Sequence, residues 1–122
     1  MADKDELGRA GEERAARYLA EAGYDVVARN WRCAAGEIDI VAVDAGTVVV
    51  VEVKTRRTEA FGHPFEAIDP RKRARLWRLA MAWTAVHRDI VQHRRLRIDA
   101  IAVLGADART AHLEHLVDVE VP

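Results

Sequence analysis

Cysteine, long apolar runs and ligand-binding loops are scarce in this chain, and each shortage excludes a class of protein. The single cysteine, Cys33, cannot form an internal disulfide framework, which fits a reducing cytoplasm. No apolar run approaches the roughly 20 residues that a membrane-spanning helix needs, and the polar start is unlike a signal peptide. The sequence also has no zinc-binding Cys/His spacing, no glycine-rich phosphate loop and no internal repeat. We therefore expect a cytoplasmic protein that does not bind membranes.

The chain does contain enough apolar sequence for one folded domain. Half of its 122 residues are hydrophobic, and a chain of this length can bury a core as a single unit. We expect one domain over residues 1–122, with about five disordered residues at the N-terminus.

The net charge of −1 hides two segments of opposite sign. Residues 54–97 contain twelve Lys/Arg and four Asp/Glu, a balance of +8, whereas the remainder contains seven and sixteen, a balance of −9. A cationic segment beside carboxylates is what a protein that handles a polyanion through a metal ion would need. Solvated helix faces also produce charge blocks, so this pattern alone does not decide between nucleic-acid binding and ordinary surface charge.

Residues 36–54 are the stretch that carries the most information about function. Two runs rich in β-branched residues, 38–43 and 47–53, flank turn-forming residues, which predicts a β-hairpin. A loop with an even number of residues pairs Val43 with Val48 and, farther along, Asp39 with Glu52. Directly opposite residues have Cβ atoms about 4.5–5.5 Å apart, so these carboxylates could share one cation. A three-residue loop would place them on opposite faces of the sheet.

Both hairpin strands carry apolar residues on both faces, which predicts helices above and below a central sheet. We assign these residues to one face or the other by strict alternation: Ile38, Ile40, Val49, Val51 and Val53 on one, and Val41, Val43, Val48 and Val50 on the other. A carboxylate among buried valines must be paired, protonated or metal-bound. One alternative to a metal site is therefore a network in which Lys54 and the carboxylates neutralise one another. The same register places Glu37 opposite Lys54, where it would tune that lysine or support the site.

The first predicted helix covers residues 7–22 and ends at Gly23. Glu12 lies at the edge of its apolar arc, while Glu13 lies well outside it. We expect Glu12, rather than Glu13, to reach the sheet. The alternative is an acid in the first turn that is stabilised by the helix dipole.

The second predicted helix begins with Asp69 as N-cap and Pro70 as first helical residue, and runs to about His87. Lys72 falls inside its apolar arc, so this side chain either extends along the helix to solvent or points at the carboxylates or a bound phosphate. Three arginines form the basic face of the helix: Arg71, Arg75 and Arg78.

Loop 56–65 connects the hairpin to this helix and has no periodicity, which is typical of a substrate-contacting flap. It contains Arg56, Arg57 and His63, and a lone loop histidine is more typical of the surface than of a proton carrier.

The remaining strands are predicted at residues 24–31, 97–104 and 112–119, the last at a sheet edge. Arg97 and Asp99 share a face, which predicts an ion pair. His112 and His115 face opposite ways, which disfavours a shared metal ion.

Several motifs resemble known families. Gly11-Glu12 with Ala16-x-Tyr18-Leu19, Asn30-Trp-Arg32, Gly36-Glu-Ile-Asp-Ile-Val41 and Val51-Glu-Val-Lys-Thr-Arg56 are similar to the bacterial YraN-type family, over about Leu7 to Val103. Asp39 followed by Glu52-Val-Lys54 resembles the PD-(D/E)xK nuclease superfamily, although Ile38 stands where that superfamily often has proline. The YraN-type family is itself similar to archaeal Holliday-junction resolvases.

This resemblance implies an α/β fold with a restriction-endonuclease-like mixed central β-sheet flanked by helices, in the order αβββαββ. It implies Asp39, Glu52 and Glu12 as metal ligands, with the carbonyl of Val53 as a further candidate. It makes Lys54 the charge that orients the attacking water or stabilises the phosphate. Mg²⁺, or Mn²⁺, is the implied cofactor, since Mg²⁺ binds through few carboxylates together with waters and phosphate oxygens.

We therefore predict a metal-dependent endonuclease that hydrolyses DNA phosphodiester bonds, with structured or branched DNA as the expected target. Five basic residues are predicted to contact nucleic acid: Lys72, Arg56, Arg57, Arg71 and Arg75. A homodimer with Trp77 and Met81 at its interface is a further expectation. The competing class is a non-catalytic nucleic-acid-binding module on the same fold.

Overall fold

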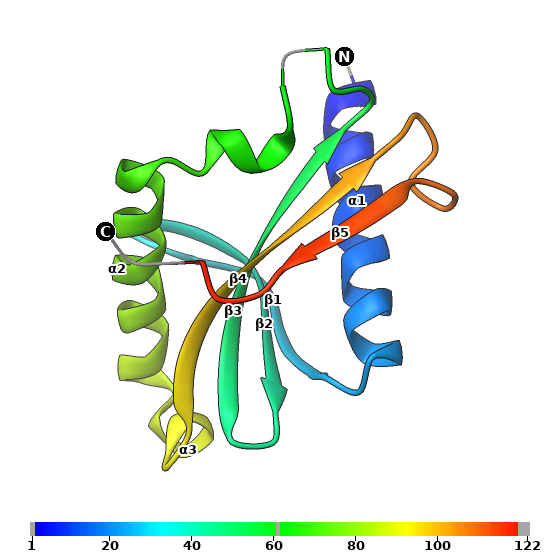
Figure 1. Ribbon diagram of the computed structural model, residues 1–122. Helices are drawn as coiled ribbons and strands as arrows, with labels where there is room; N and C mark the ends of the chain where they lie inside the picture. The colour runs from blue at the N-terminus through cyan, green and yellow to red at the C-terminus, as the bar shows by residue number, and fades with distance from the viewer. Residues whose placement is uncertain (1, 61, 120–122) are drawn as a thin grey trace.

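One five-stranded mixed sheet runs through the computed structural model, which describes residues 2–60 and 62–119 (Figure 1). The elements in chain order are α1 (Ala2–Glu21), β1 (Asp25–Cys33), β2 (Gly36–Asp44), β3 (Thr47–Arg56), the 3₁₀ helix η1 (Pro64–Ala67), α2 (Pro70–Val86), α3 (Arg88–Val91), β4 (Arg95–Leu104) and β5 (His112–Leu116). The strands lie side by side in sequence order. All neighbours are antiparallel except β3 and β4, which are parallel and are joined through η1, α2 and α3.

The predicted fold class is confirmed. The main elements follow in the order helix, three strands, helix, two strands, and the five strands form one mixed sheet with helices on both faces (Figure 1). The short helices η1 and α3 are additions to that order. Helix α1 begins at Ala2, before the predicted start at Leu7, and thus includes residues that we expected to be disordered. Met1 lies outside the described residues.

Each helix covers one face of the sheet with its own hydrophobic core. On one face, α1 packs Ala15 and Leu19 against side chains of β2, β3 and β4 that include Ile40, Val51 and Ile101. On the other face, α2 packs four buried residues, Leu76, Leu79, Ala80 and Trp83, against Val41, Val48, Val50 and Ile98. The valine-rich strands are therefore buried on both sides, as predicted.

Ile38 departs from the predicted alternation. It belongs to the core under α2, together with Val41, rather than to the core under α1 with Ile40. The prediction was wrong here because strict alternation requires regular pairing, and the paired register of β2 and β3 extends only as far as Ile40 and Val51. Beyond that point the side chain of Asp39 accepts a hydrogen bond from the amide N–H of Val53.

Helix α2 has the predicted ends. The side chain of Asp69 accepts a hydrogen bond from the amide N–H of Lys72 at 2.8 Å, and Pro70 occupies the first helical position. This cap fixes the phase of the helix at its first turn, so that Leu76 and Leu79 face the sheet. The helix ends at Val86, with His87 as C-cap.

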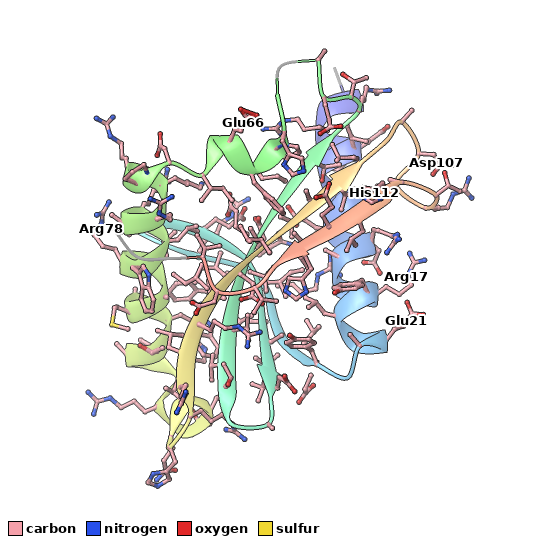
Figure 2. All side chains as sticks on the ribbon, in the orientation of Figure 1. Arg17, Glu21, Glu66, Arg78, Asp107 and His112 are labelled. Carbon is pink, nitrogen blue, oxygen red and sulfur yellow. The ribbon has the colours of Figure 1, made fainter. Side chains whose placement is uncertain are left out.

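The outer face of α2 is open to solvent. Arg78 points away from the sheet (Figure 2), and the side chain of Met81 is exposed, whereas Trp77 is partly buried against the core. The homodimer through Trp77 and Met81 stays a prediction. In the part of the chain that the structure describes, every helix is too short or too polar to cross a membrane, and a cytoplasmic location stays a prediction.

Candidate active site

The β2–β3 hairpin has the predicted register up to the residues next to Asp39 and Glu52. Its loop contains two residues, so that Asp44 pairs with Thr47 and Val43 with Val48. The pairing continues regularly to Ile40 and Val51, and the next residue on each strand is Asp39 or Glu52. The even loop therefore confirms the predicted register along the paired part of the hairpin.

Asp39 is tied to the neighbouring strand by its side chain. Its Oδ2 atom accepts a hydrogen bond from the amide N–H of Val53 at 2.8 Å. Within the described residues, Asp39 has no ion pair. Burial, followed by the negative charge of Glu52, raises the pKa of Asp39 to about 7 against the lowering effect of the hydrogen bond from Val53. The carboxyl group is thus held where its ionised form lacks a compensating cation.

Glu52 is buried and is neutralised by two lysines. Lys54 Nζ and Lys72 Nζ both lie 3.1 Å from Glu52 Oε2, and the Glu52 side chain is 8% exposed. Lys54 comes from the same strand, and Lys72 comes from the first turn of α2. Of the two orientations considered for Lys72, the structure has the one that points at the carboxylates. The neutralising network that we considered as an alternative to a metal site also forms, around Glu52 rather than around Asp39.

Glu37 does not meet Lys54, contrary to the register prediction. Its Oε2 atom instead accepts a hydrogen bond from Arg32 Nε at 2.7 Å, across the turn between β1 and β2. The reason is that the paired register of β2 with β3 stops at Ile40, whereas Glu37 remains paired with Arg32 in the ladder of β1 with β2. This ion pair was not predicted, because the sequence analysis considered the pairing of β2 with β3 and not the pairing of β1 with β2.

Glu12 reaches the same region from α1, because α1 approaches β3 closely at Gly11. A methyl group at Gly11 would lie 1.9 Å from Thr55 Oγ1, so only glycine allows this contact. Burial raises the pKa of Glu12, and the nearby charges of Glu37 and Glu52 add to the rise. Glu12 therefore lies close enough to the carboxylates of the sheet for their charges to raise its pKa, as its place on the helix predicts.

Glu13 is the matched contrast on α1. It is exposed and pairs with Arg29 at 2.7 Å. The choice of Glu12 over Glu13 as the acid that faces the sheet is confirmed, while the role of Glu12 as a metal ligand stays a prediction.

Of the arginines predicted to bind nucleic acid, Arg75 is the one with a contact to the hairpin region. A methyl group at Gly36 would lie 2.8 Å from Arg75 Nη2, so the guanidinium group lies over the turn that precedes Glu37. Arg56, Arg57 and Arg71 are exposed, and Arg56 Nη1 donates to the carbonyl of Thr55. Their contact with nucleic acid stays a prediction.

A second polar cluster lies on the α1 face of the sheet. The predicted ion pair between Arg97 and Asp99 forms, with Nε to Oδ1 at 2.8 Å and Nη2 to Oδ2 at 3.0 Å. His115 Nε2 lies 2.7 Å from Asp99 Oδ2, and its Nδ1 lies 2.9 Å from the hydroxyl of Tyr18. These contacts link β4, β5 and α1, and hold the helix that carries Glu12 to the sheet. His115 and Tyr18 are separated by 97 positions, so no local pattern reveals the link.

The donor atoms of the candidate site fit a hard divalent cation. Within residues 2–60 and 62–119, no group of three or more His, Cys, Asp or Glu side chains is arranged to hold a metal ion. Mg²⁺ commonly takes only one or two carboxylates and completes its octahedron with waters and phosphate oxygens. Asp39 and Glu52 supply such a pair, and Oδ1 of Asp39 receives no hydrogen bond from the part of the chain described. The elevated pKa of Asp39 is what a nearby cation would reverse.

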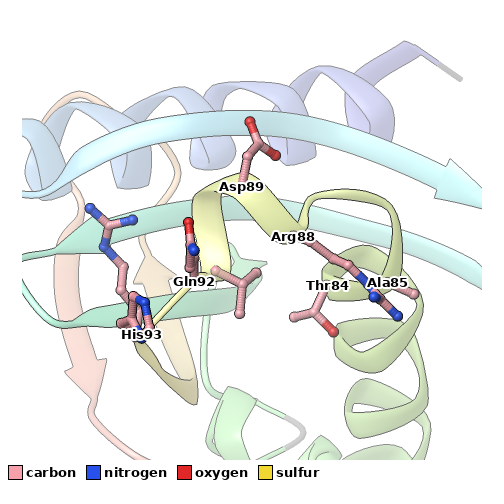
Figure 3. A pocket seen from close by; sticks show the side chains of 8 residues that line it. Thr84, Ala85, Arg88, Asp89, Gln92 and His93 are labelled. Atoms are coloured by element: carbon pink, nitrogen blue, oxygen red, sulfur yellow. The ribbon is translucent and has the colours of Figure 1, made fainter.

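One hollow of the surface lies away from this site. A hollow of about 740 Å³ lies beside α3 and the end of α2 and is lined by Thr84, Ala85, Arg88, Asp89, Val91, Gln92, His93 and Arg94 (Figure 3). Thr84 stands roughly 18 Å along the helix axis from Lys72. Asp89 is the single acidic residue among those that line this hollow, so the hollow offers no carboxylate pair.

Comparisons with known proteins identify relatives along almost the whole chain. A family model described as "Uncharacterised protein family UPF0102" matches residues 11–103. A UPF0102 protein of Arthrobacter sp. (strain FB24) is 53% identical over 116 residues, which cover 95% of this chain and 97% of the relative. UPF0102 proteins of Beutenbergia cavernae and of Leifsonia xyli subsp. xyli are 52% and 49% identical, with the same coverage of both chains.

Two solved structures show a distant similarity. A repair endonuclease from Pyrococcus abyssi has a TM-score of 0.44 and 20% identity, over 80% of this chain and 40% of that chain. The structure of an EndoMS–dsDNA2 complex has a TM-score of 0.36 and 19% identity, over 82% of this chain and 39% of that chain. At these TM-scores neither similarity supports a statement about function.

Proposed function

The chain belongs to the uncharacterised protein family UPF0102, the YraN-type family that its motifs predict, and we propose that it is a divalent-metal-dependent endonuclease acting on DNA. One observation carries the proposal: Asp39 and Glu52 lie close enough for the charge of Glu52 to raise the pKa of Asp39, and in the part of the chain that the structure describes lysines pair with Glu52 but not with Asp39. A purely structural network would neutralise both acids, because an ionised carboxylate left unpaired inside a protein is unfavourable.

In this proposal Asp39 and Glu52 would hold Mg²⁺ or Mn²⁺, and Glu12 would add a carboxylate from α1. The cation would supply a bound water of lowered pKa and neutralise charge on the phosphate. The ionised form of Asp39 would hold the cation, so binding would be coupled to loss of its proton.

The two lysines would then act on the substrate. In the structure, Lys54 and Lys72 share Glu52 Oε2, and the three groups together carry one net positive charge. With Glu52 engaged by a cation, the two ammonium groups would be available to a phosphate oxygen. Lys54, on β3, would stabilise the charge that develops in the transition state, and Lys72 would hold the bound phosphate.

The direct test is cleavage of a substrate panel by purified protein with Mg²⁺ or Mn²⁺. The panel contains single-stranded, duplex, flap and four-way-junction DNA, with matched RNA strands. We expect cleavage of at least one branched DNA by the wild type, and its loss in Asp39→Asn and Glu52→Gln, which preserve shape while removing charge. Cleavage that survives both substitutions would show that a contaminant or another site is responsible.

The competing function is a non-catalytic nucleic-acid-binding module. The pairing of Glu52 with two lysines favours it, because the same lysines could bind phosphate without any metal. This module predicts gel shifts that weaken with salt and no cleavage under any metal condition. A purely structural interaction domain predicts neither.

A further inference from the structure

His63, in the connection between β3 and α2, makes hydrogen bonds through its backbone amide and both ring nitrogens. It is therefore not the unattached surface histidine that its loop position predicts. Its side chain is 27% exposed. As N-cap of η1 it accepts a hydrogen bond at Nδ1 from the amide N–H of Phe65, at 3.1 Å. Its own amide N–H donates to Glu66 Oε2 at 2.7 Å, which completes a capping box.

The outer nitrogen of the ring reaches a different strand. His63 Nε2 lies 2.9 Å from Oε2 of Glu114 on β5. Because Nδ1 accepts a hydrogen bond, the ring proton resides on Nε2, and Nε2–H donates to Glu114. Both ring nitrogens are therefore engaged, so His63 can neither carry a proton for a substrate nor bind a metal ion while these contacts persist.

The His63–Glu114 link lies on the same face of the sheet as the two lysines. Lys54 pairs with Ala102, and Ala102 pairs with Glu114, so the three residues form one row across β3, β4 and β5. Residues in such a row point to the same face, and two strand spacings place Glu114 about 10 Å from Lys54. The link therefore fixes the middle of a connection that has Lys54 before it and Lys72 after it.

The same connection borders a hollow of about 300 Å³. Its lining residues include Arg56, Thr58, His63, Pro64 and Glu66. Arg56 is exposed at the end of β3. In the loop that follows, the amide N–H of Gly62 donates to the carbonyl of Glu59 at 2.9 Å, which forms a turn. A polyanion that extends from Lys54 along β3 would meet this hollow next, with the Arg56 guanidinium at its edge.

We propose that His63 and Glu114 are positioning residues, which hold the β3–α2 connection, beside Arg56 at the end of β3, against the nucleic-acid strand bound at the candidate site. This inference rests on the proposed function. It assigns the hollow beside η1 to the sugar-phosphate backbone that flanks the bond to be cleaved. The expected consequence is an effect on substrate affinity rather than on the chemical step.

Four substitutions isolate the link. His63→Asn keeps a capping acceptor for the Phe65 amide but cannot reach Glu114. Glu114→Ala removes the acceptor of the link, while Glu114→Gln retains an acceptor oxygen. His93→Asn is the matched control, because His93 is exposed in the turn before β4 and has φ 64°, which asparagine tolerates.

The first measurement is amide hydrogen exchange of residues 57–60 without nucleic acid, which does not depend on nuclease activity. We expect about tenfold faster exchange in His63→Asn and in Glu114→Ala, and wild-type exchange in Glu114→Gln and His93→Asn. Unchanged exchange in the first two variants would overturn the inference.

The second measurement separates KM from kcat for cleavage of the preferred DNA. We expect KM to rise about tenfold in His63→Asn and Glu114→Ala, with kcat within about twofold of wild type, and recovery in Glu114→Gln. A fall in kcat at constant KM would overturn the positioning role. If the wild type cleaves no DNA, the proposed function fails separately, and the dissociation constant for DNA replaces KM. An unchanged dissociation constant would then reject the inference as well.

Discussion

Asp39 Oδ2 accepts a hydrogen bond from the amide N–H of Val53 at 2.8 Å. A side chain of β2 is therefore the acceptor for a backbone amide of β3. The contact joins the first acid of the candidate site to the residue between Glu52 and Lys54. It fixes one carboxylate oxygen and leaves the other to a ligand. The two strands that carry the site are therefore held together at the point where regular pairing ends.

The first prediction concerns the pH dependence of stability. The pKa of Asp39 is about 7 in the folded protein and about 3.9 when unfolded, so the folded state binds more protons between these values and stability falls as pH rises through this range. Asp39→Asn lacks this titration. From pH 5 to pH 8, we expect the stability of Asp39→Asn relative to wild type to increase by on the order of 2 kcal/mol. Urea unfolding in EDTA measures this difference, and an equal pH response of both proteins would contradict it.

The second prediction concerns metal binding. Mg²⁺ or Mn²⁺ must displace the proton of Asp39, so affinity should rise with pH up to about 7 and level off above it. Calorimetry at pH 6.5 in two buffers of different ionisation enthalpy should detect proton release on binding. Asp39→Asn should bind the metal more weakly and release no proton, and Glu13→Gln, with its exposed carboxylate, serves as the control.

The third prediction separates the two lysines that share Glu52. Lys54→Met should lower kcat by about 10²–10³ with little change in DNA affinity, because its charge acts on the transition state. Lys72→Met should raise KM, since Lys72 arrives from α2 and would hold the bound phosphate. Single-turnover cleavage and fluorescence anisotropy distinguish the two effects. Identical losses in both variants would indicate that the lysines only neutralise Glu52.

The fourth prediction concerns the close contact of α1 with β3. Gly11→Ala places a methyl group 1.9 Å from Thr55 Oγ1, and we expect a loss of about 1–3 kcal/mol in stability together with weaker metal binding as Glu12 moves outward. Thr55→Ala should restore part of both losses in the double variant. Gly8→Ala is the control, because no atom lies within 4 Å of its added methyl group, and it should stabilise the helix by up to about 1 kcal/mol. Thermal unfolding and metal titration measure both quantities.

Local patterns in the sequence predicted those parts of the site that depend on local geometry. The register of Val43 with Val48 follows from a two-residue loop and the period of two along a strand. The inward direction of Lys72 follows from helical phase, which the Asp69 cap sets at the first turn.

Other contacts depend on where distant segments meet, and no short-range pattern encodes them. His63 and Glu114 are separated by 51 positions, and Tyr18 and His115 by 97. The face of Ile38 was misassigned for a different reason: the pairing of β2 with β3 ends at Ile40, so alternation along that pair does not extend to Ile38.

The chain order of the fold also sets a time order for building the site. The β2–β3 hairpin closes through a two-residue loop, and such hairpins form in about 1–10 μs. Lys72 lies instead in the 38-residue connection between β3 and β4, residues 57–94, whose parallel pairing requires a slower, non-local closure. We expect the two acids to meet early in refolding, with Lys54 beside Glu52, and Lys72 to reach Glu52 in a later step.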